Sequence, residues 1–226
     1  MKNYYVNKLS ADRLKLCYEI ASPRVMLYLQ AEIDFVNSHI KADDIVLELG
    51  CGYGRAIDLL PANTKLIYGI DISYESLSLA QNEFSERSNI CFSQMNSVNL
   101  AFQDNQFDVV ICIQNGISAF KVNRVELIKE ALRVTKTNGV VLFSSYSNKF
   151  WDDRLDWFKI QSGYKLVGEI DHSATKNGII ACKDGFVSNT ITEEEFRSLC
   201  FQLGYKPQVT EVDKSSVFCV IKKSEK

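Results

Sequence analysis

The residues best suited to holding a ligand form a glycine-rich run behind a short apolar segment. The apolar segment is Ile-Val-Leu at 45–47, and the run after it contains Glu48, Gly50, Cys51, Gly52 and Gly54. Glycines between a strand and a helix can adopt positive φ angles, and they let a ligand approach the backbone because no Cβ atom stands in the way. This spacing predicts a ligand-binding loop at the end of a buried strand.

An acidic residue ends the next apolar run along the chain. Asp71 follows the run at 66–70 and lies 19 residues after Gly52. At that separation a carboxylate can accept hydrogen bonds from a ribose bound over the glycine loop. A dinucleotide-binding G-x-G-x-x-G pattern would need glycine where Arg55 stands. These features favour a nucleoside with an amino-acid tail over one with a diphosphate, and they leave a nicotinamide-dependent oxidoreductase as an alternative.

Apolar runs alternate with helical patterns through the middle of the chain. Strands are predicted at 45–47, 66–70, 90–92, 109–113 and 140–143. Helices are predicted near 54–60, 74–86 and 122–136. This alternation is typical of right-handed crossovers and of a parallel sheet covered on both faces. Such sheets bind ligands at the carboxyl ends of their strands, where the glycine run and Asp71 would meet.

The two ends of the chain follow other patterns. Helices are predicted from Ser10 to about Ile20 and, after the Ser22–Pro23 start signal, to about Ile40. Both tryptophans lie between 147 and 191, with an antiparallel pair expected around 165–171 and 178–187. A capping box at Thr192 opens a helix to about Leu203, and strands at 207–213 and 216–222 form a hairpin at the sheet edge.

Composition and charge exclude several classes of protein. Hydrophobic residues make up 46% of the 226 residues and charged residues 24%, which is ordinary globular usage. A net charge of −2 provides no general attraction for phosphate backbones, so a nucleic-acid partner is not expected. The sequence has no apolar run near the ~20 residues that span a membrane. The start at residues 1–6 lacks the apolar core of a signal peptide, so we expect a cytoplasmic protein that binds no membrane.

Cysteine and histidine spacing gives no metal-ligand pattern. The seven cysteines form no C-x-x-C pair, and most lie among apolar neighbours. They are typical of buried free thiols in a reducing compartment. His39 and His172 are the two histidines, and neither has a second ligand at helical spacing. We therefore expect no metal site.

The segment VLELGCGYGR at 46–55 resembles the first motif of the class I S-adenosylmethionine-dependent methyltransferases. The resemblance continues through 68–73, 94–102 and 107–116 and covers roughly residues 41–145. It implies a Rossmann-like α/β fold: a seven-stranded, mostly parallel sheet with a C-terminal antiparallel hairpin, helices on both faces and an N-terminal helical lid. It also implies S-adenosyl-L-methionine as cofactor and S-adenosyl-L-homocysteine as product.

The resemblance also implies roles for the residues around the glycine run. Gly50, Gly52 and Gly54 would lie against the methionine and ribose portions of the cofactor, and Glu48 would organise the loop or nearby water. Asp71 would hold the ribose hydroxyls.

Three further positions would contact the adenine, and two would face the reacting groups. Ile72 would pack on the adenine face, while Asn96 and the backbone of Ser97 would read its edge. Many family members carry aspartate where Asn96 stands; the amide keeps an acceptor oxygen but brings no charge. Gln114 and Asn115, after the fourth strand, would face the sulfonium and the acceptor.

Three other residues are candidates of a different kind. Arg24 can pair with the cofactor's carboxylate, although an exposed helix arginine is the simpler explanation. His172, beside Asp171, is a candidate general base, and a surface histidine is the competing interpretation. Cys51 is better explained as a small residue under the loop than as a nucleophile, because no nearby histidine would activate it.

The sequence as a whole predicts a methyltransferase acting on an N or O atom of a small organic acceptor. The aromatic residues of 147–191 suit a small-molecule pocket, and no D/N-P-P-Y motif or Pro-Cys nucleophile is present. The alternatives are the oxidoreductase and a non-catalytic S-adenosylmethionine-binding module, which Asn96 favours. We expect one domain over 1–226, comprising a lid at 1–40, a cofactor-binding core at 41–146, a substrate-side insertion at 147–191 and a C-terminal helix and hairpin at 192–226.

Overall fold

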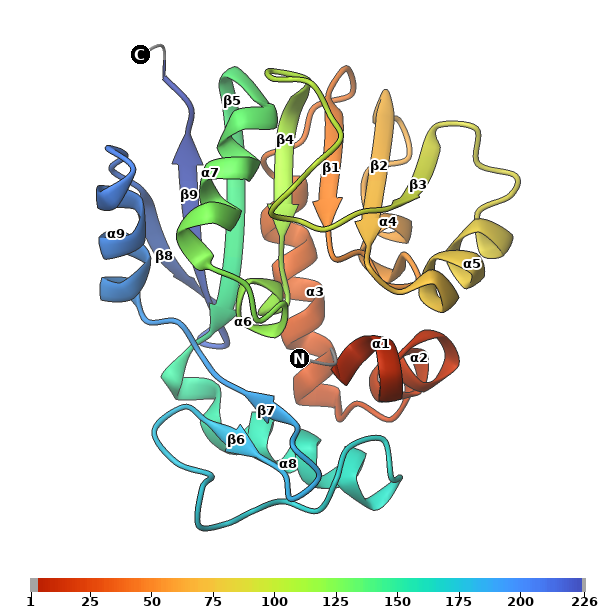
Figure 1. The fold of residues 1–226 in the computed structure, drawn as a ribbon, viewed down its shortest axis with the longest axis vertical. Coiled ribbons are helices and arrows are strands. Elements are labelled where there is room, and N and C mark those ends of the chain that lie inside the picture. Colours follow the sequence, from red (N-terminus) through yellow and green to blue (C-terminus); the bar gives the residue numbers. More distant parts are fainter. Residues whose placement is uncertain (1–3, 225–226) are drawn as a thin grey trace.

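A seven-stranded sheet forms the centre of the computed structural model, which describes residues 4–224 (Figure 1). Its strands are β1 (Ile45–Leu49), β2 (Leu66–Asp71), β3 (Ile90–Gln94), β4 (Phe107–Cys112), β5 (Thr135–Tyr146), β8 (Gln208–Val212) and β9 (Ser216–Lys222). Their order is β3-β2-β1-β4-β5-β9-β8. The first five are parallel, and β9 is antiparallel to both β5 and β8. The predicted fold class is confirmed.

Helices cover both faces of this sheet. They are α1 (Tyr4–Lys8), α2 (Ala11–Glu19), α3 (Pro23–Asn37), α4 (Arg55–Asp58), α5 (Tyr74–Glu83), α6 (Gly116–Ala119), α7 (Arg124–Val134), α8 (Trp151–Gly163) and α9 (Glu193–Gln202), with a 3-10 turn at Asn148–Phe150. Helices α7 and α9 pack against the face that carries Leu47 and Val110. Helices α3, α4 and α5 pack against the face that carries Val46 and Ile111. The central strands are apolar on both sides because both sides are covered.

Local signals fix several helix boundaries where the sequence predicts them. The Ser22 hydroxyl accepts from the backbone N–H of Val25, with Pro23 in the first turn of α3. Thr192 and Glu195 form a reciprocal capping box at the start of α9. Ser10 precedes α2, but its side chain makes no capping hydrogen bond.

The insertion differs from the prediction. The expected antiparallel pair at 165–171 and 178–187 forms only in part. Ile170 makes an isolated antiparallel bridge with Cys182, while β6 (Ile180–Ala181) pairs with β7 (Val187–Ser188). The physical reason is a turn inside the second predicted strand, where Gly185 has φ +94°. Helix α8 was not predicted, nor was the short helix α6.

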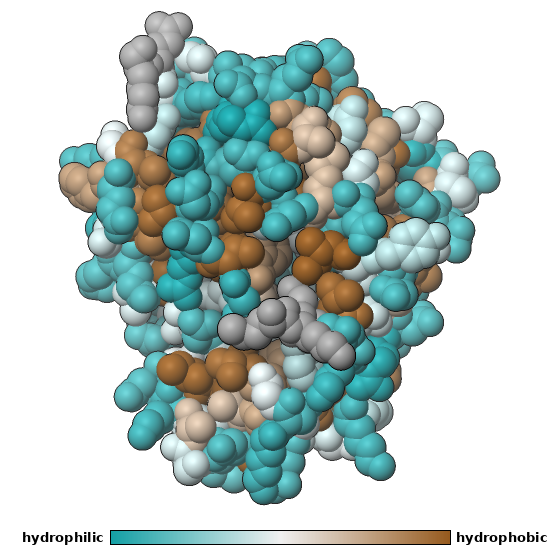
Figure 2. Space-filling view, in the orientation of Figure 1, coloured by the Kyte–Doolittle hydropathy of each residue, from teal (hydrophilic) through white to brown (hydrophobic). Residues whose placement is uncertain are grey.

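The insertion packs against the N-terminal helices beyond one end of the sheet. In Figure 1, α8, β6 and β7 lie below the strands, and α1 and α2 lie between them and the sheet. Leu9 and Cys17 share a buried cluster with Phe158 and Phe186. Hydrophobic residues also gather near this junction on the face shown in Figure 2. Among residues 4–224, no helix is long and apolar enough to span a bilayer.

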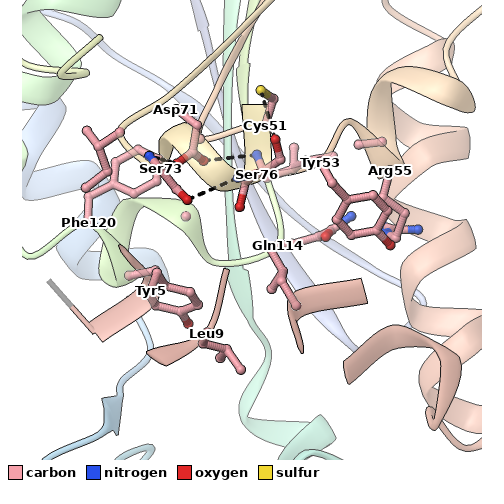
Figure 3. Close-up of a pocket in the computed structure, with 18 of the residues that line it drawn as sticks. Tyr5, Leu9, Cys51, Tyr53, Arg55, Asp71, Ser73, Ser76, Gln114 and Phe120 are labelled. Carbon is pink, nitrogen blue, oxygen red and sulfur yellow. Dashed lines mark hydrogen bonds between the residues drawn. The ribbon is translucent and has the colours of Figure 1, made fainter. Parts of the chain in front are cut away.

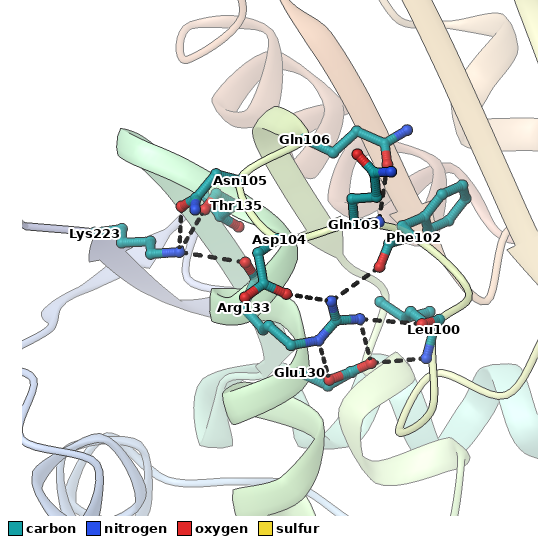
Figure 4. Close-up of polar contacts among 10 residues, drawn as sticks. All are labelled: Leu100, Phe102, Gln103, Asp104, Asn105, Gln106, Glu130, Arg133, Thr135 and Lys223. Carbon is teal, nitrogen blue, oxygen red and sulfur yellow. Dashed lines mark hydrogen bonds and ion pairs between the residues drawn. The ribbon is translucent and has the colours of Figure 1, made fainter.

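A polar network centred on Arg133 holds the crossover between β3 and β4 in place (Figure 4). The guanidinium donates to the carbonyls of Leu100 and Phe102 and to the carboxylates of Asp104 and Glu130. Hydrogen bonds from Arg133 lower the pKa of Glu130. The network anchors this crossover to α7, and it lies away from the carboxyl ends of the parallel strands.

Candidate functional site

A cavity opens at the carboxyl ends of β1, β2 and β4 and extends to the insertion. Its empty volume is about 1330 Å³, including the part that opens to solvent. The wall on the sheet side comes from the glycine loop and from the segments after β2, β3 and β4, and the opposite wall from α1, α2, α8 and the end of β5. The strand order reverses between β1 and β4, which is where open α/β sheets bind ligands.

The glycine loop lies flat against the end of β2. The N–H groups of Gly50 and Cys51 both donate to the carbonyl of Ile70, at 2.8 and 2.9 Å. Gly50 has φ +75° and Gly52 φ +56°. The φ of Gly50 favours glycine, and a Cβ atom built there would displace the ring of Phe120. Gly54, at φ +89°, lies outside the cavity wall and starts α4.

Asp71 joins the glycine loop to the start of α5 (Figure 3). Its Oδ2 accepts from the N–H of Gly52 at 3.0 Å, and its Oδ1 accepts from the N–H of Ser73 at 2.8 Å. Burial raises the pKa of Asp71, and these backbone donors oppose that shift. Each carboxylate oxygen has a further lone pair, so Asp71 can also accept hydrogen bonds from a ligand.

Glu48 and Arg55 both lie beside the glycine loop with side-chain atoms that have no hydrogen-bond partner among the described residues. Glu48 is 5% exposed, and its Oε2 has no hydrogen-bond partner among the described residues. Burial raises the pKa of Glu48 to about 7, and the charge of Arg55 opposes the shift. The Arg55 guanidinium lies 4.7 Å from the ring centroid of Tyr18, with Nε and Nη2 buried and unpartnered in the same part of the chain. The pair provides both an acceptor and a donor to a ligand that carries both charges.

An apolar slot continues from Asp71. Ile72, Met95, Phe120 and Val122 line it, with Asn96 and the buried Ser97 at its edge. The Oδ1 of Asn96 accepts from the N–H of Val98 at 3.2 Å. The amide oxygen that we expected to read an adenine amino group keeps a second lone pair, and the amide NH₂ can also donate to a ligand.

Gln114 lines the cavity in a conformation held by a buried carboxylate. It has φ +53°, and its N–H donates to Oε2 of Glu32 at 2.7 Å. Glu32 is fully buried and also accepts from the hydroxyl of Ser216 at 2.6 Å. The Nε2 of Gln114 is buried and makes no hydrogen bond to any residue in 4–224. Cys51 also lines the cavity, but burial raises the pKa of its thiol, which disfavours a nucleophilic thiolate.

Besides Gly54, three other predicted residues lie away from the cavity, and we correct the prediction for all four. Arg24 pairs with the carboxylate of Asp213 at 2.7 Å, so it does not reach the glycine loop. His172 is exposed in a turn of the insertion. Asn115 is 4% exposed and faces the protein interior. Its Nδ2 donates to the carbonyl of Asn189 at 2.9 Å, and its Oδ1 accepts from the hydroxyl of Ser145 at 2.8 Å.

These contacts predict that Asn115 stabilises the junction between sheet and insertion. Asn115→Ala removes both hydrogen bonds inside a buried site, so we expect the free energy of unfolding to fall by about 1–3 kcal/mol. His172→Ala is the matched control and is expected to change it by less than about 0.5 kcal/mol. Urea denaturation of the two variants checks this. Equal stabilities would contradict the structural role of Asn115.

The sequence did not reveal the residues on the insertion side of the cavity. The main ones are Tyr5, Leu9, Tyr146, Trp157, Phe158, Gln161 and Phe186. Arg55 also lines the cavity and was not predicted to do so; in the sequence it served only to exclude a dinucleotide pattern. Its place one residue after Gly54 was the available signal, because a helix start beside a glycine loop faces the bound ligand.

Comparisons with known proteins agree with this geometry. A family model described as "Methyltransferase domain" matches residues 46–139. YqeM of Bacillus subtilis (strain 168), provisionally named a methyltransferase, is 32% identical over 105 residues, which are 46% of this chain and 42% of that protein. Residues 46–139 thus match a methyltransferase domain, and the chain spans less than half the length of this relative. S-adenosylmethionine-dependent methyltransferases use S-adenosyl-L-methionine as cofactor and release S-adenosyl-L-homocysteine as product.

Solved structures resemble the fold around this methyltransferase domain. The PH0226 protein of Pyrococcus horikoshii OT3 superposes with a TM-score of 0.68 at 21% identity, covering 99% of this chain and 100% of that one. A SAM-dependent methyltransferase structure from Methanosarcina mazei gives a TM-score of 0.61 at 20% identity, covering 85% and 98%. At these identities the likeness concerns the fold. Within residues 4–224, no group of three or more histidine, cysteine, aspartate or glutamate side chains is arranged to hold a metal ion.

Proposed function

We propose that the methyltransferase domain transfers the methyl group of S-adenosylmethionine to an N or O atom of a small organic acceptor. The observation that supports this most is a single cavity that joins the glycine loop and Asp71 to an aromatic wall at the insertion. Cavities with mostly apolar walls and a few polar groups are typical of small-molecule sites. The net charge of −2 supports no nucleic-acid partner. Six buried free thiols and one half-buried thiol suit a cytoplasmic location.

The unpaired atoms of the cavity fit the proposed cofactor. The carboxylate of Glu48 would accept from its ammonium group, and Arg55 would donate to its carboxylate. Asp71 would accept from the ribose hydroxyls while it holds Gly52. Ile72 would pack against the adenine, and the NH₂ of Asn96 would donate to the ring edge.

The chemistry supplied by the bound cofactor is a methyl group on a sulfonium, which is a good leaving group. The protein's part is alignment and the exclusion of water, for which effective molarities reach about 10⁵–10⁸ M. The N-terminal helices close the cavity for this purpose. The N–H of Ala11 donates to the hydroxyl of Ser76 at 3.0 Å, and the indole of Trp157 donates to the carbonyl of Cys17 at 2.9 Å. These bonds tie the lid to the core on one side and to the insertion on the other.

Calorimetry with S-adenosylmethionine and S-adenosylhomocysteine tests the cofactor, and labelled methyl transfer to a panel of amines, acids and phenols tests the reaction. Binding together with transfer supports the proposal. Binding without transfer to any acceptor would favour the non-catalytic module. No heat with either nucleoside would contradict the placement of the cofactor.

The pKa of Glu48 predicts a pH dependence of cofactor binding. Because Glu48 must be ionised to hold an ammonium group and its pKa is about 7, affinity is expected to rise about tenfold per pH unit between pH 5 and 7 and then level off. The pKa of Glu48 in the folded protein lies above its ordinary value of 4.5. Ionisation of Glu48 therefore lowers the free energy of unfolding as the pH rises from 4.5 to about 7. Calorimetry across this range checks the affinity. Glu48→Gln should remove the slope, and Glu169→Gln, on the exposed insertion surface, should leave it; a slope retained in Glu48→Gln would contradict the assignment.

A further inference from the structure

We infer that the acceptor is an anion with a flat apolar body, such as an aryl carboxylate or an acidic phenol, and that the buried guanidinium of Arg154 selects its negative charge. The inference rests on the proposed function and goes further by naming the class of acceptor. It comes from the walls at the insertion end of the cavity and from the charge directly behind them.

Aromatic and aliphatic side chains dominate the insertion end of the cavity, and none of the described residues there carries a carboxylate. Tyr5 and Leu9 line it from the N-terminal segment, and Trp157, Phe158 and Phe186 line it from the insertion. Figure 3 shows Tyr5 and Leu9 across the cavity from Asp71. The only carboxylates among the described lining residues, Glu48 and Asp71, belong to the glycine-loop end. An ammonium-bearing acceptor would lose its hydration here without gaining a counter-charge.

Arg154 is a buried cation with no carboxylate partner. It lies on α8 and is 1% exposed. Its Nη1 donates to the carbonyl of Gly178 at 3.0 Å, and its Nη2 donates to the carbonyl and hydroxyl of Ser188 at 2.9 and 2.8 Å. Its Nε has no partner, and no carboxylate oxygen of residues 4–224 lies within 4.0 Å of the group. Arginine is almost never fully buried unless it is paired, and here only neutral oxygens accept hydrogen bonds from it, so its positive charge is not neutralised.

The guanidinium stands directly behind the cavity wall. Its carbon lies 4.4 Å from the ring centroid of Tyr146 and 5.9 Å from that of Phe158, and both rings line the cavity. Burial raises the pKa of Tyr146, and the charge of Arg154 opposes this shift. Burial also raises the pKa of Tyr5, which lines the same end of the cavity, and the charge of Arg154 opposes that shift too. A positive charge within a low-dielectric wall favours an anion in the adjoining space and is weakly screened there.

A second polar group supports the same chemistry. Gln161 lies one turn beyond Trp157 on α8, lines the cavity and is 3% exposed. Its side-chain amide makes no hydrogen bond to another described residue and can donate to an anionic oxygen. No histidine lines the cavity, so an acidic hydroxyl would depend on the positive field of Arg154 to stabilise its oxyanion.

Calorimetry on the full chain saturated with S-adenosylhomocysteine tests the inference. The probes are benzoate and phenylacetate, each beside its matching amide and amine. We expect the carboxylates to bind at least about tenfold more tightly than the amides, and the amines to bind most weakly. Equal or tighter binding of the amines, or no binding of either carboxylate, would overturn the inference. Failure to bind S-adenosylhomocysteine would instead count against the proposed function, because that affinity is measured first on the same sample.

Variants on the same helix locate the charge. Arg154→Met should erase the preference for carboxylate over amide while leaving the affinity for S-adenosylhomocysteine unchanged. Lys159→Met removes a positive charge from the exposed face of α8, where Lys159 pairs with Asp156, and should keep the preference. If Arg154→Met fails to fold, Arg154→Lys retains the charge with fewer donors and should keep most of the preference. Loss of the carboxylate preference in Lys159→Met, or its survival in Arg154→Met, would overturn the assignment of this preference to Arg154.

Discussion

Asp71→Ala is expected to weaken the binding of S-adenosylmethionine by about 3 kcal/mol, a loss of roughly 100-fold. The variant loses the acceptor for the proposed ribose hydroxyls, and it also leaves two backbone donors without their partner. These donors are the N–H groups of Gly52 and Ser73, which now lie 3.0 and 2.8 Å from the carboxylate. The glycine loop therefore loosens at the same time as the contact to the ligand is lost. Calorimetric titration measures the change in affinity.

Two controls separate these contributions. Asp71→Asn keeps one acceptor oxygen and loses the charge, so it should fall between the wild type and Asp71→Ala. Asp58→Ala removes a carboxylate from the exposed surface of α4 and should leave the affinity unchanged. Wild-type affinity in Asp71→Ala would mean that the nucleoside lies elsewhere.

The part of the site that could be predicted depends on backbone features with strong local signals. Gly50, Gly52 and Asp71 occupy strand ends, and the strand order brings these ends to one edge whatever the side chains around them. Gln114 and Asn115 were harder, because both follow β4. The structure gives them φ angles of +53° and +63°, and this turn sends Gln114 into the cavity and Asn115 into the interior. Sequence spacing alone contains no information about that turn.

The acceptor side was less predictable for a different reason. Helix α8 buries Arg154, Trp157, Phe158 and Gln161, and the polar members of this set interrupt the apolar stripe by which an amphipathic helix is identified. Their burial is explained only by tertiary partners such as the carbonyls of Gly178 and Ser188. Arg24 is a residue that the sequence wrongly placed at the site. Its true partner, Asp213, lies 189 residues away in sequence, so local spacing could not indicate the pairing.

Gly50→Ala is expected to abolish most cofactor binding, through two effects that add. An alanine at φ +75° costs about 1–2 kcal/mol of backbone strain. Its Cβ would also collide with the ring of Phe120, and that ring lines the cavity, so its displacement changes the shape of the ligand site. We expect affinity for S-adenosylmethionine to fall more than about 100-fold, equivalent to more than about 2.7 kcal/mol. Calorimetry gives the affinity, and urea denaturation gives the accompanying loss of stability.

Gly204→Ala isolates the backbone strain. Gly204 has a nearly equal φ of +78°, but a Cβ atom there would meet nothing within 4 Å. It should lose about 1 kcal/mol of stability and no cofactor affinity. The double variant Gly50→Ala/Phe120→Leu replaces the colliding ring with a smaller side chain that keeps the slot apolar, and it should recover part of the affinity lost in Gly50→Ala. If Gly50→Ala binds as tightly as Gly204→Ala, the cofactor does not depend on the close approach of the loop and Phe120. The cradle would then have to be formed by other parts of the cavity wall.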